Sequence, residues 1–306
     1  LRGLLRTAAA TAGSAVSGTP VTANFCTVRG AYTREAFHDQ QAKIVTAING
    51  LDADVVALME VENSASITYL PGQPRDKALA NLVDELNKAA GSQVWGYVAS
   101  PTVVPPHEDV IRTAFIYRLD SVRPEGPSLI LMDDAYANAR QPLAQKFVAK
   151  DVRGSFVAVA NHFKSKGSGA DDGTGQGKSN PSRTAQAQAL IDWSAKEFAG
   201  EPVFLLGDFN AYGMEDPVMK IKDAGYTEVV EQLAPGASTF QYGGRLGSLD
   251  HIFANAAAGT CSAPRRERMR PQFGSSPCTA VLMSGLMVTP RAAPRNSKRR
   301  AVPRKA

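Results

Sequence analysis

Short apolar runs alternate along this chain with stretches of helical spacing, and this alternation limits the folds that it can adopt. Runs with the length of buried strands occupy residues 54–59, 113–118, 143–150, 155–162, 202–210 and 248–254. Apolar residues three and four positions apart predict helices over 35–50 and 76–90, and another after residue 181. The "DVRG" segment before residue 155 predicts a hairpin. Because hairpins and crossover helices occur together, we expect an α/β fold with mixed sheets and outer helices.

The pattern divides the chain of 306 residues into one large domain and two flanking segments. We expect residues 21–255 to form the domain, whereas residues 1–20 show no defined pattern. Residues 256–306 are rich in Arg, Pro and Ala and lack a sustained period. We therefore expect this basic tail to be disordered.

Charge is distributed unevenly between the domain and the tail. From residue 256 onward lie 11 of the 34 Lys and Arg residues and one of the 29 acids, a net charge of +10. The preceding residues carry the other 23 basic and 28 acidic side chains, a net charge of −5. An acidic domain needs a cation or a few placed basic groups to handle phosphates, whereas the tail either attracts polyanions or is a solvated end. No run reaches the roughly 18 apolar residues of a membrane span, and no obligate protein partner is indicated.

The stretch "FLLGDFNA", residues 204–211, delivers two polar side chains at the end of an apolar strand. Asp208 and Asn210 are two residues apart, and such residues share a side of an extended chain. The carboxylate can bind a metal or orient water, and the amide can hydrogen-bond a phosphate oxygen. Asp and Asn are also common in turns, so this stretch alone predicts either a site or a simple turn.

Two other polar residues follow apolar strands. Glu60 ends the run in "VVALMEVEN" (55–63), where a carboxylate can bind Mg²⁺ or Ca²⁺ or simply face solvent. His162 precedes a Gly-rich loop at 164–181, and a histidine there can protonate a leaving oxygen or have a structural role. Lys164, in the same loop, can contact phosphate or face water.

In their order along the chain, "LMEVEN", "NHFKSKGSG", "DGTGQG", "LLGDFNA" and "LDHIFAN" resemble the endonuclease/exonuclease/phosphatase superfamily, which has the DNase-I-like fold. Within it, residues 37–63 are similar to secreted bacterial nucleases of the extracellular type. The resemblance covers residues 24–255 and is specific in combination, since no single motif identifies the family. It implies a four-layer sandwich of two mixed β-sheets flanked by helices, with the site at the sheet edges. It also implies an extracellular or periplasmic location.

The resemblance implies roles for four catalytic residues. His162 matches the histidine that assists the leaving group. Asp208 and Asn210 match the pair that positions the nucleophilic water and the phosphate. Asp250 matches an aspartate that supports this pair or a metal.

The resemblance also implies a divalent cation, Mg²⁺ first, with Ca²⁺ and Mn²⁺ as alternatives. Glu60 matches the metal-binding glutamate, and Asn24 is carried over for a metal-site asparagine. Three basic or amide side chains from the loop and the helix after it are expected to contact substrate phosphate: Lys164, Asn180 and Arg183.

The chain departs from the family at its C-terminal end. Family members close with an Asp-His pair whose histidine is the general base, and here no histidine follows His251. Asp250 and His251 are adjacent in "GSLDHIF" (247–253), and adjacent residues of a strand face opposite sides of a sheet. If Asp250 faces the site, His251 faces away, so we expect His251 to be a packed or surface histidine.

These features predict a divalent-metal-dependent phosphodiester hydrolase, a nuclease acting on DNA or RNA, impaired by loss of the general-base histidine. General-base catalysis is worth about 10² to 10⁴-fold in rate. One alternative is a non-catalytic remnant that binds nucleic acid through its tail. Another is a phosphatase or phospholipid phosphodiesterase of the same superfamily.

Overall fold

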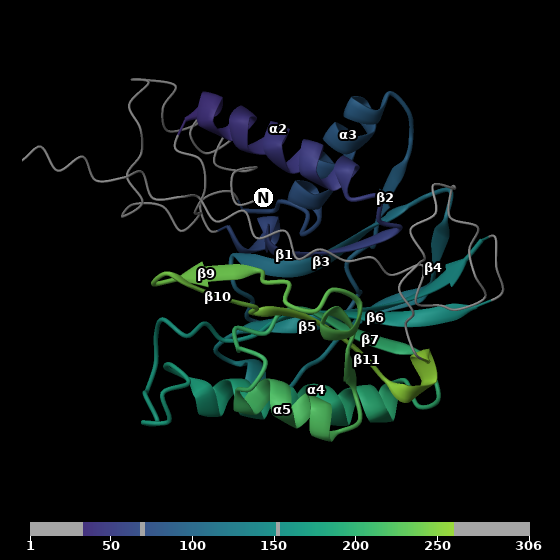
Figure 1. The fold of residues 1–306 in the computed structure, drawn as a ribbon. Coiled ribbons are helices and arrows are strands. Elements are labelled where there is room, and N and C mark those ends of the chain that lie inside the picture. The colour runs from purple at the N-terminus through teal and green to yellow at the C-terminus, as the bar shows by residue number, and fades with distance from the viewer. Residues whose placement is uncertain (1–32, 68–70, 151–153, 260–306) are drawn as a thin grey trace, which may run out of the picture.

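The computed structural model describes residues 33–67, 71–150 and 154–259, which form four stacked layers (Figure 1). Two helices lie on one outer face, two sheets lie in the middle, and two more helices lie on the opposite face. The predicted four-layer arrangement is therefore confirmed. Among the described residues, no helix is long and apolar enough to cross a membrane. Most of the predicted basic tail lies outside these residues.

The small sheet has the strand order β1-β3-β2, with bounds Val55–Glu62, Ile111–Arg118 and Trp95–Tyr97 respectively. Both pairings are antiparallel within the described strands. The expectation of two mixed sheets is therefore wrong for this sheet. The reason is that β3 runs back against both of its neighbours. Helices α2 (Arg34–Gly50) and α3 (Lys77–Ala90) pack their apolar side chains on its outer face, as their spacing predicts.

The large sheet is mixed and has the strand order β4-β5-β6-β7-β11-β8. Its strands in that order are Val122–Ile130, Arg140–Ala149, Ser155–His162, Val203–Asp208, Asp250–Ala254 and Thr227–Glu228. β5 and β6 form the predicted hairpin, and β6 and β7 are parallel because α4 (Asn180–Glu197) connects them as a crossover. Helix α4 and helix α5 (Asp216–Asp223) cover the outer face of this sheet.

Shorter elements complete the described fold. Helix α6 (Val229–Leu233) follows β8, and a two-stranded hairpin, β9 (Phe240–Tyr242) with β10 (Arg245–Gly247), precedes β11. Single 3₁₀ turns occupy Ser64–Ser66, Asp134–Tyr136 and Ala256–Ala258. Because Ala258 is buried in the core, the packed domain continues a few residues past the predicted boundary at 255.

The core between the two sheets is apolar and rich in phenylalanine. Phe115 of the small sheet contacts Phe147 of the large sheet, with ring centroids 5.8 Å apart. Phe147, Phe156 and Phe204 continue this series across β5, β6 and β7. The sheets therefore pack face to face, and the polar ends of their strands lie at the margin of a rigid core.

Candidate active site

One row of polar side chains crosses four strands of the large sheet. β6 and β7 are parallel, so their carboxyl ends reach the same edge, and His162 is the register partner of Asp208. β11 runs the other way and begins there, which places Asp250 opposite Asp208. Arg140 of β5 is the partner of His162 on the other side. Register partners share a face, so the row lies on the side of the sheet that faces the other sheet.

Asp208 lies at the centre of this row and is almost completely buried. Its carboxylate lies 3.6 Å from Nε2 of His162. It accepts hydrogen bonds from the backbone N–H of Asn210 at 2.8 Å and from the Asn210 amide at 3.1 Å. The same amide donates to the carbonyl of Phe163 at 3.1 Å. The φ of Asn210 is +49°, in the left-handed region, and this backbone angle accompanies the tight turn between Asp208 and Asn210.

The electrostatics of the row favour protonated carboxyl groups. Burial, and next the charge of Asp250, raise the pKa of Asp208 from 3.8 to about 7, although the bond from the Asn210 N–H lowers it. Burial also raises the pKa of Asp250, and the hydroxyl of Thr239 offsets part of that rise. Two carboxylates directly opposite each other on a sheet repel, so this pair is costly to the fold when both are ionised.

Glu60 reaches the same region from the small sheet. The register between β1 and β3 shifts between Leu58 and Val61, and Glu60 in that bulge has a φ of +58°. Its charge contributes to the raised pKa of Asp208, which places Glu60 near the row. Bulges re-aim side chains at sheet edges. The candidate site is therefore built from both sheets.

The model of the Endonuclease/Exonuclease/phosphatase family matches residues 24–268. The chain belongs to this family. Members of the family are hydrolases, nucleases and phosphatases among them. No curated protein matches the sequence.

Solved structures resemble the chain at low identity. An endonuclease/exonuclease/phosphatase family protein from Bacteroides thetaiotaomicron is 15% identical with a TM-score of 0.49, over 72% of this chain and 76% of that one. The human Nocturnin catalytic domain is 16% identical with a TM-score of 0.49, over 76% and 80%. A mannosyl-6-phosphatase from Bacteroides thetaiotaomicron is 14% identical with a TM-score of 0.48, over 72% and 78%. These similarities are too distant to bear on the substrate.

The chemistry of the row fits the divalent cation that the family implies. Glu60, Asp208 and Asp250 supply hard oxygen donors, and a cation beside them would relieve the repulsion that raises the pKa of Asp208. Within the described ranges, no three His, Cys, Asp or Glu side chains are gathered to hold an ion by themselves. Mg²⁺ commonly takes one or two carboxylates and completes its shell with water and substrate phosphate. Asn24, the other predicted ligand, lies outside the described residues.

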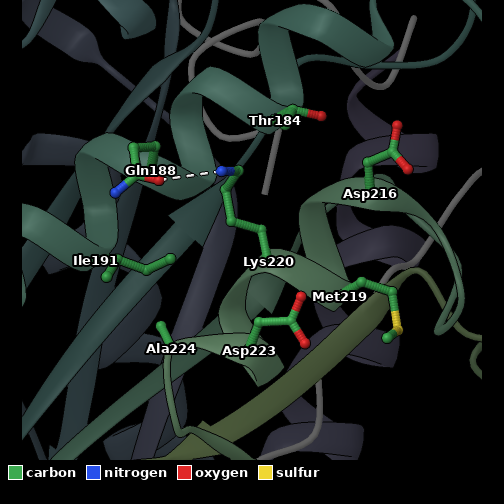
Figure 2. Close-up of a pocket in the computed structure, with 8 residues that line it drawn as sticks. All are labelled: Thr184, Gln188, Ile191, Asp216, Met219, Lys220, Asp223 and Ala224. Atoms are coloured by element: carbon green, nitrogen blue, oxygen red, sulfur yellow. Dashed lines mark hydrogen bonds between the residues drawn. The ribbon is translucent and has the colours of Figure 1, made fainter.

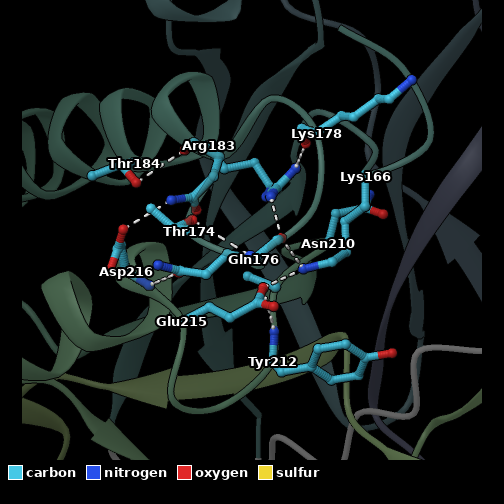
Figure 3. Close-up of polar contacts among 12 residues, drawn as sticks. Lys166, Thr174, Gln176, Lys178, Arg183, Thr184, Asn210, Tyr212, Glu215 and Asp216 are labelled. Carbon is cyan, nitrogen blue, oxygen red and sulfur yellow. Dashed lines mark hydrogen bonds and ion pairs between the residues drawn. The ribbon is translucent and has the colours of Figure 1, made fainter. Parts of the chain in front are cut away.

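Polar contacts in and around the Gly-rich loop engage the remaining predicted residues, and Figure 3 shows those of Arg183. Arg183 is fully buried, and its guanidinium donates to the backbone carbonyls of Gln176 at 3.0 Å and Lys178 at 2.6 Å. The Asn180 amide donates to two aspartates, Asp172 and Asp216, at 3.1 and 2.8 Å. Arg183 thus ties the loop to α4, and Asn180 joins the loop to α5, whereas the phosphate contact expected of both remains a prediction.

Lys164 is the predicted phosphate-contacting residue that stays partly exposed. Its ammonium group donates to the hydroxyl of Ser168 at 3.0 Å, at the base of the loop. Its backbone N–H donates to the Gln186 amide oxygen on α4 at 2.9 Å. Lys164 therefore remains within the loop that follows His162.

Arg140 belongs to the site and was not predicted from the sequence. Its charge lowers the pKa of Asp208, and its guanidinium donates to the Phe163 carbonyl at 3.2 Å. No local motif marks this arginine. The predicted hairpin alone would pair Gln141 with His162, and a register shift between Arg140 and Leu143 brings Arg140 there instead.

A separate groove of about 410 Å³ lies between α4 and α5, in the outer helical layer (Figure 2). Its lining consists of Thr184, Gln188, Ile191, Asp216, Met219, Lys220, Asp223 and Ala224. None of the predicted site residues lines it. Lys220 and Gln188 bridge the two helices with a hydrogen bond of 3.1 Å.

His251 faces away from the row, which confirms the expectation from strand alternation. Its ring lies on the helix-covered side of the large sheet, between Phe209 and Phe253, with centroids 5.9 and 5.5 Å away. The other histidines outside the site are His38 on α2 and His107, which is exposed in the loop before β3. His162 is therefore the histidine that the fold brings to Asp208.

Proposed function

We propose that this protein is a divalent-metal-dependent phosphodiester hydrolase that cleaves nucleic acid. The observation that carries the proposal is the contact between the carboxylate of Asp208 and the imidazole of His162, 3.6 Å apart in the row that ends at Asp250. A base and an acid held side by side at a sheet edge suit a reaction in which water attacks and an alkoxide leaves.

The chain's own residues divide the proton transfers between them. Asp208 takes the proton of the attacking water when it is ionised, and the burial that raises its pKa makes it a stronger base than an exposed aspartate. Asn210 holds the Asp208 carboxylate through its amide and backbone N–H. His162 gives a proton to the leaving oxygen. A divalent cation bound near Glu60 would polarise the scissile phosphate.

We expect the rate of hydrolysis to be limited, because no second histidine in the row assists Asp208 as the base. The four histidines of the sequence all lie in the described ranges, and of these His162 belongs to the row. Asp208 therefore serves as the base where the family resemblance implies a histidine. We expect the lack of a histidine base to lower the rate, and general-base catalysis is worth about 10² to 10⁴-fold in all.

The β9–β10 hairpin supports a nucleic-acid substrate. Phe240 and Tyr242 stack with ring centroids 6.4 Å apart and planes at 10°, and Tyr242 is 75% exposed. Arg245 of the same hairpin is exposed as well. The backbone N–H of Asp250 donates to the Thr239 hydroxyl at 3.3 Å, which ties the hairpin to the row. Exposed aromatic faces with a cation beside them suit nucleobases and a phosphate backbone.

The test is cleavage of single-stranded DNA, duplex DNA and RNA, alongside a small phosphomonoester and a phospholipid vesicle. We expect Mg²⁺-dependent cleavage of nucleic acid that EDTA abolishes and that Asp208→Asn lowers at least 10²-fold. Asp192→Asn is the matched control, because Asp192 is exposed on α4. Cleavage that survives EDTA or Asp208→Asn contradicts the proposal.

The same panel separates the alternatives. Turnover of the phosphomonoester or the vesicle, without cleavage of nucleic acid, favours a phosphatase or a phospholipid phosphodiesterase. Salt-sensitive binding without cleavage, lost when residues 256–306 are removed, favours a non-catalytic protein that binds through its tail. A secreted location, which the resemblance implies, agrees with a nuclease of extracellular nucleic acid and is tested by fractionating the producing cells.

A further inference from the structure

The turn that carries the catalytic pair has an unfavourable backbone and needs external support. Asn210 has a φ of +49°, which costs free energy for a residue with a side chain. Gly207, just before Asp208, has a φ of +131°, and a Cβ there would lie 2.2 Å from the Asn161 carbonyl oxygen. A turn in this conformation persists when surrounding contacts over-determine it.

Strand β11 holds this turn at two points. The backbone N–H of Phe209 donates to the carbonyl of Leu249 at 2.9 Å, which fixes the middle of the turn. Nε2 of His251 lies 2.8 Å from the carbonyl oxygen of Ala211, the residue after Asn210. The second contact is made by a side chain, and it fixes the point where the chain leaves the turn.

Both ring nitrogens of His251 face oxygen acceptors. Nδ1 lies 2.9 Å from the carboxylate of Glu228 on β8, and Nε2 faces the carbonyl of Ala211. A carbonyl oxygen can only accept, so Nε2 carries a proton and donates it to Ala211, while Nδ1 pairs with the Glu228 carboxyl group. His251 and Glu228 are both nearly fully buried, so water does not compete for either contact.

The aromatic surroundings also fix the orientation of the ring. The ring is held flat against Phe253, with planes at 23°, so its N–H directions are fixed by packing. A buried pair like that of His251 and Glu228 gives little net stability, and its use is to fix one geometry.

We propose that His251 is a positioning residue, which donates from Nε2 to the Ala211 carbonyl and so holds the Asp208–Asn210 turn in its reactive geometry. The proposal rests on the proposed function, because the turn matters through the reaction at Asp208. Glu228 orients the ring in the way that a carboxylate orients a histidine behind many reactive centres. His251 does not touch the reacting atoms, since it lies on the opposite face of the sheet.

Two substitutions of equal polarity separate positioning from packing. The amide nitrogen of glutamine reaches about as far as Nε2 of histidine, whereas that of asparagine reaches about as far as Nδ1. His251→Gln therefore keeps a donor for Ala211, and His251→Asn keeps a contact with Glu228 alone. Both remove the aromatic ring and its charge, so a purely structural role affects the two variants alike.

We expect His251→Asn to lower kcat about 10²-fold with KM within about twofold, the effect of misplacing catalytic groups by about 1 Å. His251→Gln should recover kcat to within about fivefold of the wild type. Urea unfolding of both variants checks that they fold. Equal losses of kcat in the two variants, or a change in KM alone, overturns the proposal.

A second readout does not depend on activity. In full-length protein with ¹⁵N-labelled histidine and ¹³C-labelled alanine carbonyls, we expect an NMR coupling between Nε2 of His251 and the Ala211 carbonyl carbon across the hydrogen bond. A protein that shows this coupling and cleaves no substrate contradicts the proposed function and keeps the positioning contact. A missing coupling contradicts the positioning contact itself.

Discussion

Replacing Asp208 with asparagine should make the fold more stable at alkaline pH, although it removes a proposed catalytic group. Burial, and next the charge of Asp250, raise the pKa of Asp208 from 3.8 to about 7. Between these two values the folded state keeps a proton that the unfolded state has lost. Stability therefore falls as the pH rises through this window, and the loss is complete above the folded-state pKa.

The magnitude follows from the size of the shift. One pKa unit corresponds to about 1.36 kcal/mol, so ionising Asp208 costs the fold about 4 kcal/mol by pH 8. Asparagine avoids this cost, but it leaves the Asn210 amide without its acceptor, a loss of about 1 kcal/mol at every pH. We expect Asp208→Asn to be about 1 kcal/mol less stable than the wild type at pH 4.5 and about 3 kcal/mol more stable at pH 8.

Urea unfolding in EDTA between pH 4.5 and 8 measures this crossing. With a slope of about 2 to 3 kcal/mol per molar urea, the wild-type midpoint should fall roughly 1.5 M further than that of Asp208→Asn. Deprotonation of His251 also lowers the stability of the protein as the pH rises through the raised pKa of this residue. Both proteins contain His251, so its contribution cancels in the difference. Parallel curves for the two proteins would refute the reasoning, and the exposed-site control Asp192→Asn should run parallel to the wild type.

Three further substitutions test other parts of the structure. Gly207→Ala should cost about 3 kcal/mol or more, because its Cβ would lie 2.2 Å from the Asn161 carbonyl oxygen; an unchanged urea midpoint would contradict this. Arg183→Met should leave two carbonyls of the Gly-rich loop without donors and so destabilise the protein by about 2 to 4 kcal/mol. Proteolysis within the loop should become faster, and a proteolysis rate equal to that of the wild type would argue against this support. Glu60→Gln should raise the Mg²⁺ concentration for half-maximal activity about 10-fold or more, and an unshifted metal titration would remove Glu60 from the ligand set.

The long elements of this fold were predictable because each carries a strong local pattern. Helices α2 and α3 follow their apolar spacing, and the β5–β6 hairpin follows two apolar runs around a short turn. β4 was missed because it contains Pro124, Gly126 and Pro127, which argue against a strand. The chain tolerates them there because β4 is an edge strand, and its register with β5 shifts in that segment. Edge position is a property of the sheet and not of the local sequence.

The local pattern predicted the candidate site where a strand ends on a polar residue. His162 and Asp208 follow apolar runs directly, and the parallel pairing of β6 and β7 brings them together. Asp250 begins β11 and was expected from the family resemblance alone, whereas Arg140 begins β5 and reaches His162 through a register shift that the sequence does not show. Arg183 and Asn180 were expected at the phosphate from the family resemblance. Sequence could not tell that both are buried, with their donors used by backbone carbonyls and aspartates.

Asp250 and His251 also explain why the register of β11 is fixed. A slip of one residue would turn Asp250 toward Phe209, on the helix-covered face, and bring His251 to Asp208, which would create an Asp-His pair at the site. The slip is prevented because it would bury an aspartate in the apolar helix-covered layer and leave the Glu228 carboxylate without its partner, and each costs several kcal/mol. The adjacent aspartate and histidine thus serve opposite faces of one strand. On the face away from Asp208, the His251 ring contacts both the Glu228 carboxylate and the carbonyl of Ala211, the residue that follows the Asp208–Asn210 turn.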